Sequence, residues 1–375
     1  MTLDHFQLQQ LWWVLLSLVG ALLLAMTFVQ GGQTLLWTTT RGEQERTLVV
    51  NALGRKWELT FTLLVLFGGA FFAAFPRFYA VSFGGAYWLW MLILITFVLQ
   101  GVSFEFRNKA GNLFGPRGYE GFLFLNGSLG LLALGAAVGT LFTGGSFVID
   151  GSGRMSWGTP LHGLEALLTP YNVILGLALV LTARVLGALY LIQAIEAPNL
   201  TERLRESAWK NLLAALPLIL FLLLRWHGMT GYGYAADGAI VAVAGKYLDN
   251  LIALGLFGIG FAAIGLALLA GGTGMARFTP VRGGVWLAAA GALLFGLALF
   301  LVCGLNETAF YPSLLDPAAS LTIRNASSSR YTLAVMAWAA LSVPLILGYV
   351  AYVWRLMGAR PLVADEVKND PHHSY

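Results

Sequence analysis

Few side chains in this sequence could carry acid–base chemistry, and most of them stand at the ends of long apolar runs. Glu58 follows Trp57 at the start of one such run, and Glu105 and Arg107 close another. Ionisable side chains are costly inside a bilayer, so those that occur there usually serve a function. Because burial raises the pKa of a carboxylate, Glu58 is a candidate for moving protons. The structural alternative is a carboxylate that only favours the positive end of a helix.

The cationic side chains also leave alternatives open. Arg184 lies about two thirds through an apolar run. It could extend its guanidinium to the membrane surface, or it could bind the head group of a quinone or a lipid. Trp57 and Arg107 are further candidates for a head-group contact. Solvation at the membrane interface is the simpler expectation for Arg107 and Glu105, and Glu105 is also a candidate for a proton route.

Ligands for a metal or haem are scarce, since the sequence has five histidines and one cysteine, Cys303. Two histidines on separate spans could ligate a haem. However, His162 and His227 both fall at the ends of apolar runs, where ordinary interfacial side chains are expected. His372 and His373 lie in a polar tail and are expected to be solvated. We therefore expect no metal site, no internal disulfide and no firmly bound cofactor in this chain.

The elements that must position these residues are membrane helices. Of the 375 residues, 58% are hydrophobic and only 11% are charged. The apolar residues fill whole segments, and a span needs roughly 20 of them to cross about 30 Å of hydrocarbon. Lipid-exposed backbone must be helical to pair its polar groups. The sequence therefore predicts an all-α integral membrane protein with about nine spans, at residues 9–30, 58–75, 78–104, 120–144, 165–195, 209–227, 248–274, 283–305 and 331–356.

Basic residues alternate between the predicted connections. The connections that follow the first, third, fifth and seventh spans, together with the C-terminal tail, hold 15 of the 22 lysines and arginines. The connections on the other side of the membrane hold six. Since cytoplasmic loops are rich in lysine and arginine, this predicts an external N-terminus and a cytoplasmic C-terminus. The net charge of +4 arises from basic residues distributed in this alternating way, and it does not indicate nucleic-acid binding. Glycine pairs in apolar runs, such as Gly31–Gly32, Gly68–Gly69 and Gly84–Gly85, are predicted to be packing contacts.

The order of several motifs resembles one family from end to end, subunit II of cytochrome bd-type quinol oxidases. The motifs are Trp12–Trp13, Asn51 shortly before Trp57, the run at 68–76 (GGAFFAAFP), 83–87 (FGGAY), 104–107 (FEFR), 320–322 (SLT) and 326–333 (ASSSRYTL). The resemblance implies two four-helix bundles and one peripheral helix. Residues 1–145 would form the first bundle, and residues 146–375 the second with the additional helix and a cytoplasmic tail.

The resemblance also implies a partner and a function. Haems b and d and the quinol site are expected on subunit I, with which this chain would form a heterodimer in the bacterial inner membrane. The pair would oxidise quinol and reduce oxygen to water. This subunit would support subunit I and take part in a cytoplasmic proton route. Small accessory subunits, membrane lipids and a bound quinone are further expected partners.

The chain departs from better-known members of this family at its polar positions. Where they have two aspartates late in helix 1, it has Gln30 and Gln33, and where they have an arginine in helix 3, it has Gln100. Because the negatively charged and the positively charged positions are both replaced, no buried charge is left without a partner. We therefore expect a neutral network of the three glutamines, with Glu58 as the remaining carboxylate. The alternative functions are a secondary transporter or permease, which would need charges beside broken helices, and a purely structural assembly subunit.

Overall fold

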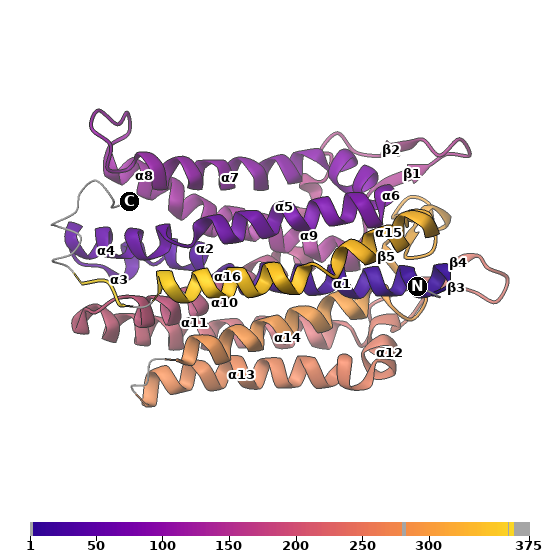
Figure 1. The fold of residues 1–375 in the computed structure, drawn as a ribbon. Helices are drawn as coiled ribbons and strands as arrows, with labels where there is room; N and C mark the ends of the chain where they lie inside the picture. Colours follow the sequence, from indigo (N-terminus) through magenta and orange to yellow (C-terminus); the bar gives the residue numbers. More distant parts are fainter. Residues whose placement is uncertain (1–2, 280–282, 359, 364–375) are drawn as a thin grey trace.

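The computed structural model describes residues 3–279, 283–358 and 360–363. Its long helices run side by side along one direction, with three short β-hairpins at the end where the N-terminus lies (Figure 1). The helices α3 and α4 lie at the opposite end of the bundle.

The bounds of the elements follow in chain order. The α-helices are α1 (His5–Ala25), α2 (Phe28–Gln33), α3 (Leu36–Thr39), α4 (Glu43–Gly54), α5 (Trp57–Ala74), α6 (Pro76–Phe78), α7 (Tyr87–Phe106), α8 (Gly115–Leu125), α9 (Leu131–Thr143), α10 (Pro170–Ala194), α11 (Pro198–Arg225), α12 (Lys246–Ala253), α13 (Ile259–Phe278), α14 (Gly284–Gly304), α15 (Arg330–Ala340) and α16 (Val343–Met357). The antiparallel strand pairs are β1 (Phe147–Ile149) with β2 (Met155–Trp157), β3 (Gly231–Tyr234) with β4 (Ile240–Val243), and β5 (Ala309–Tyr311) with β6 (Leu321–Thr322). π-Helical segments occupy Tyr79–Gly85 and Asn126–Gly130.

The described residues contain nine helical stretches that are long and apolar enough to span a membrane, which confirms the prediction of nine spans. Four of these stretches join consecutive elements. α1 continues into α2, α8 continues through the second π-helical segment into α9, a 3-10 helix at Gly255–Phe257 precedes α13, and α15 continues into α16. Local signals fix several helix starts. Asp4 and Gln7 form a capping box at α1, and proline stands in the first turn of α10 and of α11. Both devices suit helix N-termini, where backbone N–H groups lack helical partners.

Three predicted boundaries were wrong by more than five residues. The sixth span starts at Pro198 rather than 209, because the first turns of α11 are charged but still helical. The seventh starts at Gly255 rather than 248, since α12 is a separate helix. The third starts at Tyr87 rather than 78, because a short helix and a π-helical segment precede it. Hydropathy marks the apolar part of a helix, and the helix itself extends further or breaks earlier.

Helix α2 packs against α10 at very short range. A Cβ atom added at Gly31 would overlap the backbone carbonyl of Ala183, and one added at Gly187 would overlap the backbone of Gly32. The packing prediction is therefore confirmed for Gly31, and it is wrong for Gly69 and Gly84, where an added Cβ would meet no atom within 4 Å.

The two clusters of buried hydrophobic residues both draw on the first 145 residues and on the rest of the chain. For example, Gly135 of α9 lies against Gly176 of α10, where an added Cβ would come within 2.5 Å of the neighbouring Cα. The division into a bundle at 1–145 and a second at 146–375 stays a prediction.

Candidate functional site

The structure brings two of the three predicted glutamines together. Gln30 of α2 donates from Nε2 to Oε1 of Gln100 in α7, at 2.8 Å, and both side chains are fully buried. Gln33 is equally buried in the same short helix, and Asn126 is buried where α8 meets the π-helical segment that packs against α2 and α7. We call these four buried, neutral side chains of α2, α7 and the second π-helical segment the buried amide cluster.

The described protein atoms leave several polar atoms of the buried amide cluster without a hydrogen bond. Oε1 of Gln30, Nε2 of Gln100, both polar atoms of Gln33 and Oδ1 of Asn126 have no hydrogen-bond partner among the described residues. An unpaired buried amide costs roughly 1–3 kcal/mol, and buried polar atoms of this kind are usually bonded to ordered water. The cluster is therefore suited to hold water deep inside the subunit.

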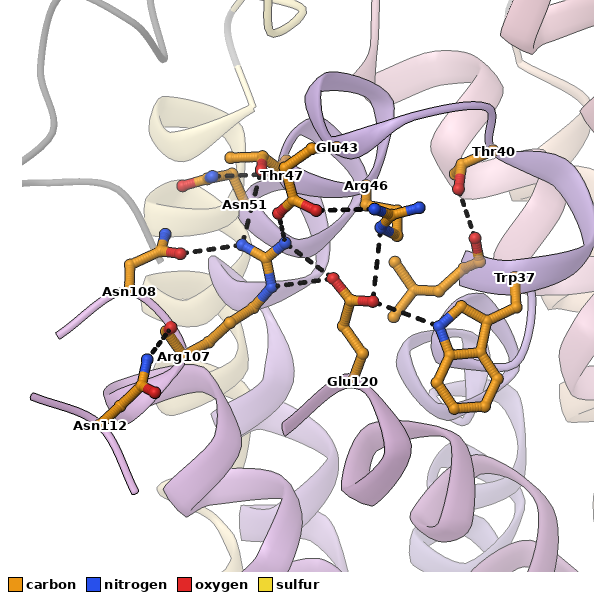
Figure 2. A network of polar contacts seen from close by, with 11 residues as sticks. Trp37, Thr40, Glu43, Arg46, Thr47, Asn51, Arg107, Asn108, Asn112 and Glu120 are labelled. Atoms are coloured by element: carbon orange, nitrogen blue, oxygen red, sulfur yellow. Dashed lines mark hydrogen bonds and ion pairs between the residues drawn. The ribbon is translucent and has the colours of Figure 1, made fainter. Parts of the chain in front are cut away.

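A second buried polar group surrounds Arg107, at the end of α7 (Figure 2). The guanidinium is only 1% exposed. Its Nε and Nη2 donate to Oε1 of Glu120 at 3.2 and 2.8 Å, and Nη2 also donates to Glu43 at 2.5 Å. Nη1 donates to Asn108 at 2.9 Å and to Thr47 at 3.5 Å. All five N–H donors of the arginine are therefore engaged within the chain.

Glu120 of α8 is the centre of this ion-pair network and is fully buried. Its second oxygen accepts a hydrogen bond from the indole Nε1 of Trp37 at 3.2 Å and lies 3.4 Å from Nε of Arg46. Arg46 also pairs with Glu43 at 2.7 Å. Two arginines thus balance two glutamates, and the network ties α3, α4, α7 and α8 together at one end of the bundle (Figure 2).

This ion-pair network stabilises the negatively charged form of Glu43. Partial burial alone would raise the pKa of Glu43, but hydrogen bonds and positive charge from Arg46 and Arg107 outweigh burial and lower it. Since its side chain is 55% exposed, this contact is worth less than the buried pair of Arg107 and Glu120.

Two expectations for this region were wrong. Arg107 is neither solvated at the interface nor free for a head group, because glutamates from two other helices enclose it. The sequence interpretation missed Glu43, Arg46 and Glu120 altogether. The available signal was that Arg107 and Glu120 carry opposite charges at adjoining ends of consecutive apolar runs.

Glu58 does not lie in a buried position of this chain. It stands in the first turn of α5 and is exposed, as is Glu105 near the end of α7. The deep carboxylate is Glu120 instead. Trp57 stacks on Phe104 with ring centroids 6.1 Å apart, and its indole nitrogen is buried with no hydrogen-bond partner among the described residues.

Lys56, next to these residues, is a buried cation that the sequence interpretation did not single out. Its side chain is 3% exposed, and Nζ has no hydrogen-bond partner among the described residues. It lies 4.2 Å from the ring centroid of Trp354 in α16, a cation–π contact. Burial, with the neighbouring charge of Arg55, lowers the pKa of Lys56 to about 8. The amine therefore gives up its proton more readily than an exposed lysine.

Arg184 is held by neutral acceptors from two other parts of the chain. Its Nε donates to Oδ1 of Asn211 at 2.8 Å, and Nη1 donates to the hydroxyl and the carbonyl of Thr34 at 2.7 and 3.1 Å. Nη2 donates to Thr38 at 3.3 Å. No carboxylate of the described residues pairs with it.

Two of the described histidines contact backbone carbonyls at separate places. His5 contacts the carbonyl of Ser328, and His162 contacts the carbonyl of Gly85 and stacks on Tyr87, so these rings are engaged at separate places. In the described part of the chain, no group of three or more His, Cys, Asp or Glu lies together as a metal site. His372 and His373 lie outside the described residues.

Comparison with known families decides between the functional alternatives. Residues 8–357 match the family described as cytochrome bd terminal oxidase subunit II. The chain belongs to this family. The match spans nearly the whole sequence, so this subunit II is a component of a quinol oxidase complex with a subunit I, and the transporter alternative is not supported.

Individual relatives agree with the family assignment. This subunit II is 28% identical to "Cytochrome bd-I ubiquinol oxidase subunit 2" of Escherichia coli K12, with full coverage of both chains. It is 26% identical to "Cytochrome bd ubiquinol oxidase subunit 2" of Bacillus subtilis, over 92% of this chain and 94% of the relative. Its fold is similar to that of the bd oxidase from Geobacillus thermodenitrificans, with a TM-score of 0.56 at 11% identity, over 93% of this chain and 99% of the other.

Proposed function

We propose that this subunit II supports a haem-bearing subunit I that oxidises quinol and reduces oxygen to water, with haems b and d on that partner. The family match over residues 8–357 carries the proposal. The scattered contacts of the described histidines support the placement of the haems on the partner. Small accessory subunits and a bound quinone stay predictions.

The proposed contribution of this chain is a hydrated path for protons from the cytoplasm. The unpaired atoms of the buried amide cluster support it, because water bound there could carry protons that glutamine cannot. Glu58 and Glu105 would receive protons from the solvent or at the subunit boundary, since both are exposed on this chain. Gln30, Gln33 and Gln100 would hold the inner waters in place.

A tagged form of this chain is expected to co-purify with a haem-bearing subunit that shows a haem d absorption band. In that complex, Glu58→Gln is expected to lower oxygen consumption about tenfold or more, since removing a proton carrier costs about 10²–10⁴-fold when the group acts in the limiting step. Oxygen uptake with quinol as donor measures this effect.

The haem spectrum of the Glu58→Gln complex is the internal control, because it must equal that of the wild type. Glu206→Gln, at an exposed carboxylate of α11, is the matched variant and should leave oxygen uptake unchanged. Wild-type turnover by Glu58→Gln would end the proton-route proposal. Recovery of this chain as a haem-free homogeneous protein would contradict the oxidase function itself.

The proposed orientation places the N-terminus and the β-hairpins outside, and α3 and α4 inside. The excess of lysine and arginine in the connections at the α4 end supports it. Thiol labelling of introduced cysteines is a direct check of this orientation. The single native cysteine, Cys303, is buried and should not compete for the reagent. In intact spheroplasts, a membrane-impermeant thiol reagent is expected to label Ala236→Cys in the β3–β4 turn and not Ala110→Cys in the α7–α8 loop. The reverse labelling pattern would overturn the orientation.

A further inference from the structure

Arg184 is a cation that no described carboxylate of the subunit neutralises. Seven of the described basic side chains form ion pairs with glutamates, namely Arg46, Arg107, Arg203, Arg205, Lys210, Arg277 and Arg324. Arg184 lies within the α10 span and bonds only to amide, hydroxyl and carbonyl oxygens. A charge at this depth needs a counter-charge, and none comes from the described part of the chain.

The contacts of Arg184 fix its depth. Its partner Asn211 directly follows Lys210, the last charged residue of α11 before the apolar stretch that ends at Arg225. Lys210 and Glu206 form an exposed ion pair, so this level of α11 is polar. Arg184 therefore lies where the hydrocarbon gives way to the head-group layer.

The same contacts prevent Arg184 from extending to the aqueous phase. Asn211 of α11, Thr34 at the end of α2 and Thr38 of α3 accept hydrogen bonds from its three nitrogens. The bond to Thr38 lies on the exposed side of the group, and it uses only one of the two N–H donors of Nη2. One N–H donor and a full positive charge therefore face the surroundings of the protein.

The surface next to Arg184 is apolar on the side of the membrane interior. Leu177 and Leu181 precede Arg184 by seven and three residues, which places them on the same face of α10. Leu177 is 43% exposed and Leu181 is half-buried. On α11, the exposed Ala214 follows Asn211 by three residues. The site thus combines a cation that has no carboxylate partner among the described residues with apolar surface beside it.

We propose that Arg184, held in position by Asn211 and Thr38, binds the phosphodiester of a phospholipid of the cytoplasmic leaflet, whose acyl chains lie along Leu177 and Leu181. A guanidinium is suited to phosphate oxygens, and its charge supplies the attraction. A net anionic head group is favoured over a zwitterionic one, because the latter brings its own cation. The inference rests on the proposed orientation for the choice of leaflet.

The test uses the whole oxidase complex, purified in mild detergent and washed to remove loosely held lipid. Quantitative mass spectrometry of the retained phospholipid is expected to show a loss of about one phospholipid per complex in Arg184→Gln relative to wild type. Arg117→Gln, at an exposed arginine in the first turn of α8, is the control and should retain wild-type lipid. Equal lipid retention by Arg184→Gln and wild type would overturn the proposal.

A second measurement keeps the proposal testable where Arg184→Gln does not assemble. Delipidated wild-type complex is titrated with phosphatidylglycerol, with phosphatidylcholine and with inorganic phosphate, and the thermal midpoint is followed. The proposal expects phosphatidylglycerol to raise the midpoint most, and an equal effect of inorganic phosphate would show a phosphate site rather than a lipid site. The haem spectrum of the same preparation tests separately whether the complex is an oxidase. The thiol labelling described above tests the orientation, and with it the choice of leaflet.

Discussion

Arg107→Met is expected to destabilise the subunit by about 3–5 kcal/mol, because it removes the partner of a fully buried carboxylate. Glu120 would keep only the indole of Trp37 and the contact with Arg46 at 3.4 Å. Glu120→Gln is expected to cost a similar amount, since it leaves the Arg107 guanidinium buried at 1% exposure with the more exposed Glu43 as its one carboxylate. The thermal midpoint of the purified complex measures both effects.

A double-mutant cycle shows whether the pair or the individual charge matters. The double variant Arg107→Met/Glu120→Gln removes both charges and is expected to cost less than either single change, since no unpaired buried charge remains. Arg46 and Glu43 still pair with each other at 2.7 Å in that variant.

The matched control is the exposed pair of Lys210 and Glu206, whose side chains are 71% and 54% exposed. Lys210→Met should shift stability by only about 0–1 kcal/mol. If Arg107→Met changed stability as little as Lys210→Met, the ion-pair network would not contribute to the stability of this subunit.

The sequence predicted the spans well because whole-segment hydrophobicity has one physical solution, a helix across lipid. It could not predict where a charged helix continues beyond the bilayer. The charged turns of α11 before residue 209 have no hydropathy signal, yet they are helical. The π-helical segment at Tyr79–Gly85 is equally apolar and helical in pattern, so its break from α7 could not be read from composition.

The candidate site was predicted in part. The meeting of Gln30 and Gln100 follows from reading the glutamines as joint replacements for charged residues, and the structure pairs them. The burial of Arg107 could not be deduced, because Glu43 and Glu120 come from α4 and α8 and their approach depends on tertiary packing. Glu58 was placed deep by its position beside Trp57, but the first turn of α5 directs it to the surface of this chain.

Gly31→Ala is expected to prevent assembly of a stable complex, because the added methyl group would overlap the Ala183 carbonyl. A backbone oxygen cannot turn aside as a side chain can, so α2 would have to move away from α10. Overpacking in a core typically costs about 1–3 kcal/mol, and a clash with backbone is expected at or above the upper end of that range. The shift would also pull Gln30 from Gln100, since both Gly31 and Gln30 lie in α2.

The structure offers two comparisons for Gly31→Ala, and the yield of haem-loaded complex and its thermal midpoint measure all three variants. Gly69→Ala, where an added Cβ meets no atom within 4 Å, should be neutral or stabilising by up to about 1 kcal/mol, since alanine favours a helix interior over glycine. Gly32→Ala should be intermediate, because the nearest atoms belong to the flexible Leu53 side chain, at 2.6 Å. The order Gly31, Gly32, Gly69 in severity is the expected result, because the rigidity of the atom that is met decides the cost. Equal behaviour of Gly31→Ala and Gly69→Ala would mean that α2 and α10 are not in direct backbone contact.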